Sequence, residues 1–544
     1  SAYAQDTWRI TDRLTATYGV RWDLNPPVDY LTFPVFAIDP DTWNPADART
    51  MKVLPLGAAT FETRWANFAP RLGLAYQLSR SNRWARVVRA GYGVFYDSGA
   101  NAAATVQGPY SARCNNLAPC TLPPYTGPAI ATVPFPVSVA NQRFVVPPVF
   151  PDQFTFPISQ GTDQLIDPRF SLPYVHEMNL TLEQQIAGRQ SLEIGYVGAL
   201  GRHLLAPVLY PPNRVNPAYL GNGTVGDTLT VFRNAADSEY HALVTKFQRQ
   251  FSHGLGAIVS YTWSHSIDTQ STGNSVNLNG VSTQAFLPTA AELAAGLPSF
   301  LRRASSDFDI RHNFGFSVVY EAPTPRQPLA RALLGHWTLA PIYHYQGAMP
   351  LDVIANATAT IGGATGVGQR PMLIPGVPIY VTGSDCVAQY AASGRGSICP
   401  GGRALNAAPV SASAAASVGC LAPTTSNAKG AFCTPAPVGG QAISGNAGRN
   451  ILRGFPLQEL DFSVHRDFPF KERFRLRFQA DLFNVFNHPN FGPPGSNVSA
   501  TNFGFSGAMA NSFLGGSSSS GAGFNPVFST GAPRNAQFAL KLFF

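Results

Sequence analysis

Short and long connections alternate along this chain, and the alternation limits the folds that it can adopt. About thirteen segments show period-two alternation of apolar and polar residues between turn-forming residues. The first connections are residues 11–13 (short), 24–66 (long), 79–85 (short) and 98–173 (long). Short and long connections continue to alternate along the rest of the chain, and one connection, 322–336, is of intermediate length. A soluble β-sandwich does not require short and long connections to take opposite sides. An outer-membrane barrel does, with tight periplasmic turns and long external loops.

The expected strands define the fold class. We predict an all-β chain that forms part of a transmembrane antiparallel up-and-down β-barrel with long extracellular loops. The expected strands are residues 3–10, 14–23, 67–78, 86–97, 174–185, 191–197, 240–251, 255–266, 311–321, 337–353, 459–468, 473–486 and 535–544.

The two faces of individual strands differ in polarity. Phe474, Leu476 and Phe478 alternate with Arg475 and Arg477. Aromatic residues reach 12%, while charged residues are only 12% of the chain, against about 25% in soluble domains. No run of about 18 apolar residues would form a membrane-spanning helix. These features favour strands with one face on lipid.

Other classes of function find little support. The formal charge is +8, but Lys and Arg are spread along the chain without a basic run, which argues against nucleic-acid binding. The ten histidines are dispersed, and no HExxH or comparable ligand spacing predicts a metal site or a cofactor. The segment 363–368 resembles a phosphate-binding loop but lacks the following Lys, so we expect an external loop. We do not expect an enzyme.

Six cysteines lie in Pro-, Gly- and Ala-rich stretches between the expected strands. They are Cys114, Cys120, Cys386, Cys399, Cys420 and Cys433. Pairing of neighbours in sequence would give three local disulfides, although fifteen connectivities are formally open. With the last strand ending in the periplasm, all six fall on the external side, where disulfides can form.

The chain ends in a strand with one apolar face. Phe538, Leu540, Leu542 and Phe544 alternate with residues of the other face. An exposed hydrophobic strand of this kind invites edge pairing in a soluble protein. In a barrel, lipid covers the apolar face and a neighbouring strand covers the edge.

Several phrases closely resemble the barrel region of TonB-dependent receptors, particularly the large Oar-like group abundant in acidobacteria. They run from the first residue to the last: 3–22 (YAQDTWRITDRLTATYGVRW), 67–76 (NFAPRLGLAY), 89–97 (RAGYGVFYD), 192–198 (LEIGYVG), 251–255 (FSHGL), 260–268 (SYTWSHSID), 306–314 (SDFDIRHNF), 448–454 (GRNILRG), 483–492 (FNVFNHPNFG) and 537–544 (QFALKLFF).

The resemblance implies a 22-stranded barrel, of which residues 1–544 would be the C-terminal part. It further implies an N-terminal plug, often preceded by a carboxypeptidase-regulatory-like domain, and neither is expected within this chain. The implied function is uptake of a large or scarce ligand across the outer membrane of a Gram-negative bacterium. The implied partners are outer-membrane lipid, the protein's own plug, TonB with ExbB/ExbD, and the barrel-assembly machinery, which would read Phe538, Leu540, Leu542 and Phe544.

Two other functions stay open at this stage. A passive porin would use the same strands without a plug, and a surface adhesion protein would bind through the long loops. The densest polar group, Asp307, Asp309, Arg311 and His312, lies at a strand entrance. We treat it as a candidate ligand-binding group, against a structural role in ion pairing at the barrel rim.

Overall fold

Thirteen strands of the main sheet pair in chain order, and two further described strands join the sheet off this path. The computed structural model describes residues 1–27, 37–45, 51–52, 54, 58–81, 83–97, 161–210, 227–271, 289–291, 303–361, 364–439, 442–470, 474–507, 509–510 and 533–544. The strands of the antiparallel path are β1 (Ala2–Arg9), β2 (Leu14–Trp22), β3 (Phe68–Ser79), β4 (Arg86–Tyr96), β6 (Tyr174–Ile186), β7 (Gln190–Tyr210), β8 (Asp227–Ser252), β9 (Leu255–Asp268), β11 (His312–Glu321), β12 (Trp337–Gln346), β22 (Leu457–Phe470), β23 (Phe474–Phe483) and β24 (Asn535–Phe543). The predicted up-and-down antiparallel fold is confirmed.

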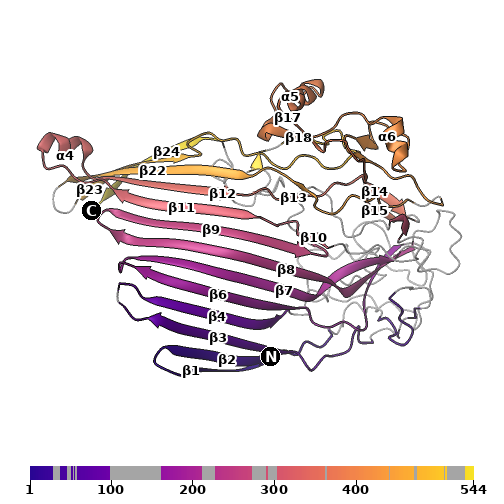
Figure 1. The fold of residues 1–544 in the computed structure, drawn as a ribbon, viewed down its shortest axis with the longest axis horizontal. Helices are drawn as coiled ribbons and strands as arrows, with labels where there is room; N and C mark the ends of the chain where they lie inside the picture. The colour runs from indigo at the N-terminus through magenta and orange to yellow at the C-terminus, as the bar shows by residue number, and fades with distance from the viewer. Residues whose placement is uncertain are drawn as a thin grey trace, which may run out of the picture.

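Short turns and long connections lie at opposite ends of the sheet (Figure 1). The β8–β9 turn shows why one end is tight. His253 and Gly254 both have positive φ, 51° and 73°, which suits a two-residue turn whose twist matches that of the paired strands. In the connection of intermediate length, helix α4 (Pro328–Leu334) begins on a proline that carries no N–H for the helix to satisfy.

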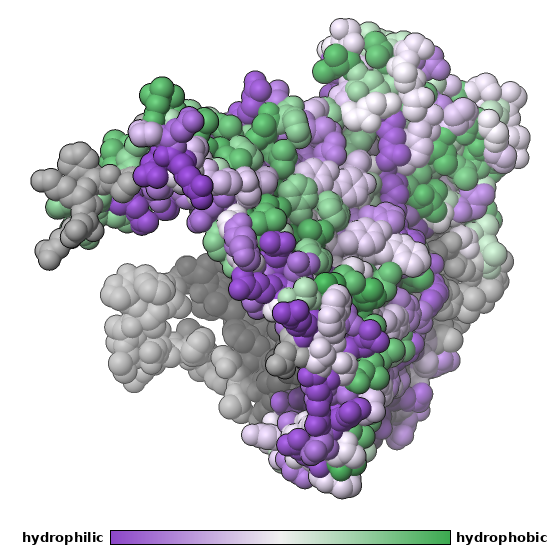
Figure 2. Space-filling view, turned by 60° about the vertical axis from the view of Figure 1, so that its left-hand side comes forward, coloured by the Kyte–Doolittle hydropathy of each residue, from purple (hydrophilic) through white to green (hydrophobic). Residues whose placement is uncertain are grey.

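The register confirms that each strand separates polar from apolar side chains. Leu14, Ala16 and Tyr18 pair with Tyr76, Leu74 and Leu72 across β2 and β3. Leu476 pairs with Leu542 and Arg477 with Lys541 across β23 and β24. We call the apolar face outward and the polar face inward. The space-filling view shows a strongly curved wall, on which hydrophobic and hydrophilic groups lie side by side (Figure 2).

Two strands are longer than the sequence predicted. The expected ranges 191–197 and 240–251 become β7 (Gln190–Tyr210) and β8 (Asp227–Ser252), so much of the expected loop between them is a paired hairpin. The ladder shifts register beside His203, whose φ is 54°, and then resumes. β5 (Gly161–Ile166) adds to β8 in parallel. The Gly and Pro residues of this region had favoured a loop, but cross-strand pairing outweighs them.

Another expected strand, 337–353, ends early. β12 stops at Gln346, and β13 (Pro350–Leu351) turns away to pair with β21 (Leu452–Arg453). The backbone N–H of Gly347 donates instead to the carbonyl of His312. The long connection that follows leaves the sheet at this point.

Two long connections fold together into a compact unit, which we call the cap and define as the described residues of 347–455 and 484–510. Leu351, Leu405, Phe432, Val498 and Phe503 are buried in its core. Its elements are β13 and β21, β14 (Asn356–Ile361) with β15 (Ala364–Gln369), β16 (Met372–Leu373) with β20 (Phe432–Cys433) and β19 (Ala428–Lys429), β17 (Tyr380–Thr382) with β18 (Arg403–Leu405), α5 (Gly383–Ala392), the 3-10 turn Pro400–Gly402 and α6 (Ala412–Ser417).

The cap corrects one prediction about its own segment. Residues 363–368 were expected to form an external loop without a strand, but Ala364–Gln369 is a strand paired with β14. The glycine-rich composition of this segment had favoured a loop, and it did not indicate the β-hairpin that forms.

Disulfides link the cap internally. Cys386 bonds to Cys399, and Cys420 bonds to Cys433, which is the neighbour pairing considered from the sequence. Cys114 and Cys120 lie outside the described residues. All four bonded cysteines belong to the buried clusters of the cap or pack against them, so both bridges reinforce its core.

Removing one bridge should loosen the cap without unfolding the sheet. We expect Cys386→Ala with Cys399→Ala to destabilise the cap by about 3 kcal/mol, the value for closing a loop of this length. Limited proteolysis of the membrane-inserted protein would measure this as faster cleavage between residues 380 and 410. Cleavage within the strands should stay at the parent rate, and faster cleavage throughout would contradict a separate cap.

Candidate functional site

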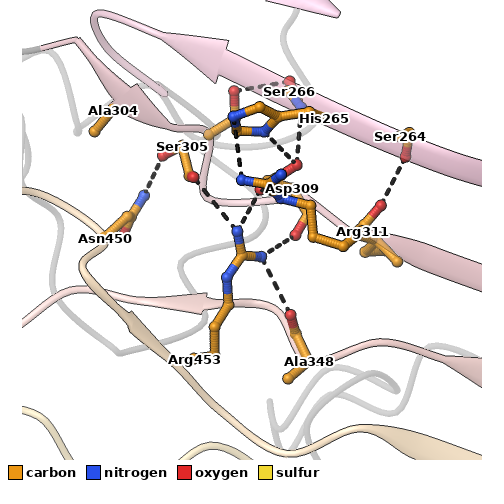
Figure 3. Close-up of polar contacts among 12 residues, drawn as sticks. Ser264, His265, Ser266, Ala304, Ser305, Asp309, Arg311, Ala348, Asn450 and Arg453 are labelled. Atoms are coloured by element: carbon orange, nitrogen blue, oxygen red, sulfur yellow. Dashed lines mark hydrogen bonds and ion pairs between the residues drawn. The ribbon is translucent and has the colours of Figure 1, made fainter. Parts of the chain in front are cut away.

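The candidate polar group lies where β9, β10 (Ala304–Ser305) and β11 meet the cap. Asp309 is the centre of this group, with its carboxylate fully buried. It accepts hydrogen bonds from the Ser266 backbone N–H at 2.8 Å and from Arg311 Nε at 3.0 Å. His265 Nδ1 lies 3.2 Å from the same carboxylate, and Arg453 Nη2 of β21 also donates to it. Figure 3 shows these side chains converging on Asp309.

Arg453 also donates to main-chain atoms on both sides of the junction. Its Nη1 reaches the carbonyl oxygens of Asp309 at 2.6 Å and of Ala348 at 3.3 Å (Figure 3). One guanidinium therefore holds a carboxylate and a carbonyl of the sheet edge together with a carbonyl of the cap. Charge-assisted bonds of this kind are the strong class of hydrogen bond.

A second arginine repeats the arrangement four residues earlier. The side chain of Arg449 is only 9% exposed and forms an ion pair with Asp268, the last residue of β9. Its Nη1 donates to Ser271 Oγ at 3.1 Å and lies 3.6 Å from Asp307. Asn450 Nδ2 donates to Asp307 at 2.6 Å. We call the two ion pairs Arg449–Asp268 and Arg453–Asp309 the rim clamp.

The cap side of the clamp is itself fixed by an ion pair. Arg370 is 2% exposed and binds Asp352 through its two terminal guanidinium nitrogens, Nη1 and Nη2, at 2.7 and 3.1 Å. Asp352 also accepts the backbone N–H of Asn450 at 3.3 Å. The segment that carries both clamp arginines is therefore also bonded to the rest of the cap through Asp352.

The structure brings together part of the predicted group. Asp309 and Arg311 form an ion pair, and Asp307 lies beside Arg449 and Asn450. His312 contacts Tyr261 of β9 instead. The geometry of these contacts fits the structural alternative, because the Asp309 and Asp268 carboxylates are buried and paired within the protein.

Sequence reasoning missed the partners of these carboxylates. Arg449, Arg453 and His265 were not among the candidates, although the phrase Gly448–Gly454 had drawn attention as a whole. Two arginines four apart between glycines were the available signal. Nothing in that spacing identifies partners more than 140 residues away.

Among the described residues, the contacts of this group are ion pairs and hydrogen bonds. Within the described ranges, no three or more His, Cys, Asp or Glu side chains are placed to hold a metal ion. In the same part of the chain, no helix is long and apolar enough to cross a membrane.

Acid should release the rim clamp. Burial favours the neutral form of Asp309, but Arg453, the Ser266 N–H and His265 outweigh it and lower the pKa of this carboxyl below its ordinary 3.8. The stabilisation is therefore present above about pH 3.8 and is lost as the pH falls through the lower, folded-state pKa. Burial raises the pKa of Asp307, although the hydrogen bond from Asn450 opposes this increase. As the pH falls, Asp307 therefore takes up its proton before Asp309 does, and this protonation favours the folded state.

Comparison with Asp309→Asn at each pH would measure this effect. We expect the parent to protect the amides of residues 448–454 from hydrogen exchange better than the variant near neutral pH. The difference should shrink as the pH falls below about 3.8 and vanish once the pH is below the lower, folded-state pKa of Asp309. A difference that persists unchanged at lower pH would show that the charge of Asp309 does not hold the clamp.

A thirteen-strand antiparallel sheet with an outward apolar face and an ion-paired outer rim is the wall of an outer-membrane β-barrel. The chain belongs to the outer membrane beta barrel domain family, which matches residues 1–513. A search of curated proteins finds no match.

Solved structures of larger receptors are also similar to this chain. Pseudomonas aeruginosa FpvA bound to a heterologous pyoverdine is 9% identical with a TM-score of 0.40, over 99% of this chain and 37% of FpvA. The ferric-catecholate import receptor Fiu from Escherichia coli K12 is 12% identical with a TM-score of 0.37, over 99% and 43%. The copper transporter OprC is 10% identical with a TM-score of 0.33, over 100% and 46%. This chain spans less than half the length of these three.

Proposed function

We propose that this chain is the barrel wall of a TonB-dependent receptor of the Oar-like group, which takes up a large or scarce ligand across the outer membrane. The observation that carries the proposal is the inward face: a polar, ion-paired wall in a sheet of thirteen strands whose β1 and β24 do not pair with each other. Wide transporter barrels of this kind hold a plug, whereas smaller porins enclose an open channel.

The inward face holds fixed charges along its length. Asp467 pairs with Arg477 at 2.7 Å and lies 3.5 Å from Arg475. Arg89 pairs with Glu183 on neighbouring strands. These side chains are partly exposed, so their remaining hydrogen-bonding capacity needs a polar neighbour or water.

A hollow on the inward face lies near the short turns. It has a volume of about 310 Å³ and is lined by β4, β6, β7 and β8 through Val87, Glu183, Ser191 and Gln248, with Arg189 from the turn. Its polar lining suits contact with the plug. The cap and the other long connections would meet ligand first, and TonB with ExbB/ExbD would supply energy from the proton gradient.

Electrical conductance of the full-length protein would test this proposal. In planar lipid bilayers, the intact protein should stay closed, because a plug fills the lumen. Deletion of the segment before residue 1 of this chain should produce large, steady conductance. Open channels in the intact protein would overturn the proposal and favour a passive porin.

A surface adhesion protein is the remaining alternative. Growth on the ligand would separate it from a transporter, since deletion of TonB should abolish uptake and leave binding to cells intact. Binding with no uptake in either strain would favour adhesion. The folded, disulfide-bonded cap is the feature that keeps this alternative worth testing.

We also propose that the last strand is read by the barrel-assembly machinery. Phe538, Leu540 and Leu542 are more than half exposed on the outward face, and Phe544 is 94% exposed. Replacement of Phe544 by Ser should lower the amount of protein in the outer membrane without altering the stability of protein refolded in detergent. Equal loss in both measurements would indicate a structural role only.

A further inference from the structure

A tyrosine and a histidine form the same contact on three separate pairs of strands. Tyr92 hydroxyl lies 2.8 Å from His176 Nδ1, between β4 and β6. The rings are stacked at 25° with centroids 6.0 Å apart. The other two pairs are Tyr196 with His241, at 2.7 Å, and Tyr261 with His312, at 2.9 Å.

All three pairs have one geometry. Each histidine lies diagonally two residues beyond the tyrosine's directly paired position, on the neighbouring strand. Each tyrosine is the sixth residue after the first residue of its strand, β4, β7 or β9. The three also share the outward face, where His176 is followed by Met178, Leu180 and Leu182.

The register places the three histidines at one height. His176 pairs with Leu200, which pairs with Glu239, and His241 lies two residues farther toward the short turns. His241 pairs with His265, and His312 is again two residues farther in that direction. Two residues over two strands correspond to a strand tilt of about 35°, at about 3.3 Å per residue and about 4.8 Å between strands. Barrel strands have this tilt, so the offset compensates for it.

This common height lies near the outer end of the apolar band. The histidines stand 10, 11 and 9 residues before the ends of β6, β8 and β11. About ten residues, tilted by about 40°, rise roughly 25 Å, which is the height of the apolar band in outer-membrane barrels.

Charged side chains begin immediately above the pairs. Glu239, two residues from His241, binds Arg202 at 3.4 Å and Arg303 at 2.5 Å. Arg311 directly precedes His312. The side chains of Arg202, Arg303 and Arg311 are 30%, 54% and 40% exposed. With Asp309 balanced by Arg453, three arginines against Glu239 and Asp237, which also lies near Arg303, leave a net charge of +1.

The tyrosine fixes which imidazole nitrogen remains available. With Nδ1 bound to the tyrosine hydroxyl, no hydrogen-bond partner is found for Nε2 of the three histidines among the described residues. If the hydroxyl donates to Nδ1, the neutral ring carries its proton on Nε2, and a protonated ring carries one there as well. Either form offers an N–H donor to the surroundings of the barrel.

We infer that these three Tyr–His pairs and the arginines above them form a binding surface for the phosphate groups of outer-leaflet lipid. Imidazole N–H groups would donate from the level of the apolar boundary and guanidinium groups from just above it. The planar guanidinium group of arginine can bind phosphate through two parallel hydrogen bonds, and basic patches at the membrane surface recognise phosphorylated head groups. The apolar side chains below would contact the acyl chains. This inference depends on the barrel fold and not on the transported ligand.

Lipid binding by the full-length protein in detergent micelles would test the inference. The probe is lipid A carrying both phosphates, compared with the same lipid after removal of its phosphates, and the readout is bound lipid in native mass spectra. The test variant combines His176→Phe, His241→Phe and His312→Phe, which keeps a ring beside each tyrosine and removes the donors. The control combines His344→Phe and His465→Phe, which change the inward face.

We expect the test variant to bind phosphorylated lipid A about tenfold more weakly than the parent, with the control unchanged. Lipid without phosphates should bind the parent and the test variant equally weakly. Arg303→Gln provides a second variant outside the strands, and it should weaken binding in the same direction. Equal affinity of the parent and the test variant for the phosphorylated lipid would overturn the inference, as would equal affinity of the parent for the two lipids.

Discussion

Arginine in place of Leu180 should block stable insertion of the barrel, while arginine in place of the adjacent Thr181 should be tolerated. Leu180 is 54% exposed on the outward face, midway between His176 and the end of β6. A charge at the middle of the lipid-facing band costs about 2–4 kcal/mol, or about 30- to 1000-fold in the folding equilibrium. Thr181 pairs with Arg89 and Gly195 on the inward face, so a charge there stays in a polar environment.

Folding into lipid vesicles, followed by the heat-modifiable migration typical of folded barrels, would measure this difference. The two substitutions differ by one position and introduce the same side chain. Helix or sheet propensity therefore cannot account for a difference between them. Equal folding yields for the two variants would contradict the assignment of the outward face.

Loss of Arg453 should release the cap from the sheet. Arg453→Ala leaves the fully buried Asp309 carboxylate without its cap partner. Breaking a buried ion pair costs about 3–5 kcal/mol, and we expect about 3 kcal/mol here because Arg453 is itself 26% exposed. Hydrogen exchange of residues 448–454 should accelerate about a hundredfold if this cost falls on local opening.

Arg395→Ala is the matched control. Arg395 also belongs to the cap, but its guanidinium lies over Phe505 and near the Thr501 carbonyl, both within the cap. Its loss should leave exchange at residues 448–454 unchanged. If Arg453→Ala has no larger effect than Arg395→Ala, the clamp does not hold the cap in place.

The local alternation of apolar and polar residues predicted the strands of the sheet well where one face of each strand contacts lipid. Period-two alternation located β2, β3 and β23, since each has one face on lipid and the other on the lumen. The same rule failed above the membrane. Residues 204–210 and 229–236 pair there, but no lipid boundary forces their sides to differ in polarity.

The candidate site shows a different limit. Asp309 and Arg311 were recognisable because they are close in sequence, whereas Arg453 joins them from a segment 144 residues away. A buried carboxylate needs a partner, yet the sequence offers many arginines for that role. The Tyr–His pairs were hidden for a related reason, since the two residues meet only through strand register.

The sequence alone determined that this chain forms a two-faced antiparallel wall with short turns at one end and long connections at the other. Lipid and water impose those patterns residue by residue, so they can be read locally. The tertiary structure decided that two long connections fold into one cap, that Arg449 and Arg453 hold it to the rim, and that three histidines share one height. Each of these depends on distances between segments far apart in the chain, which are set only when the strands pair.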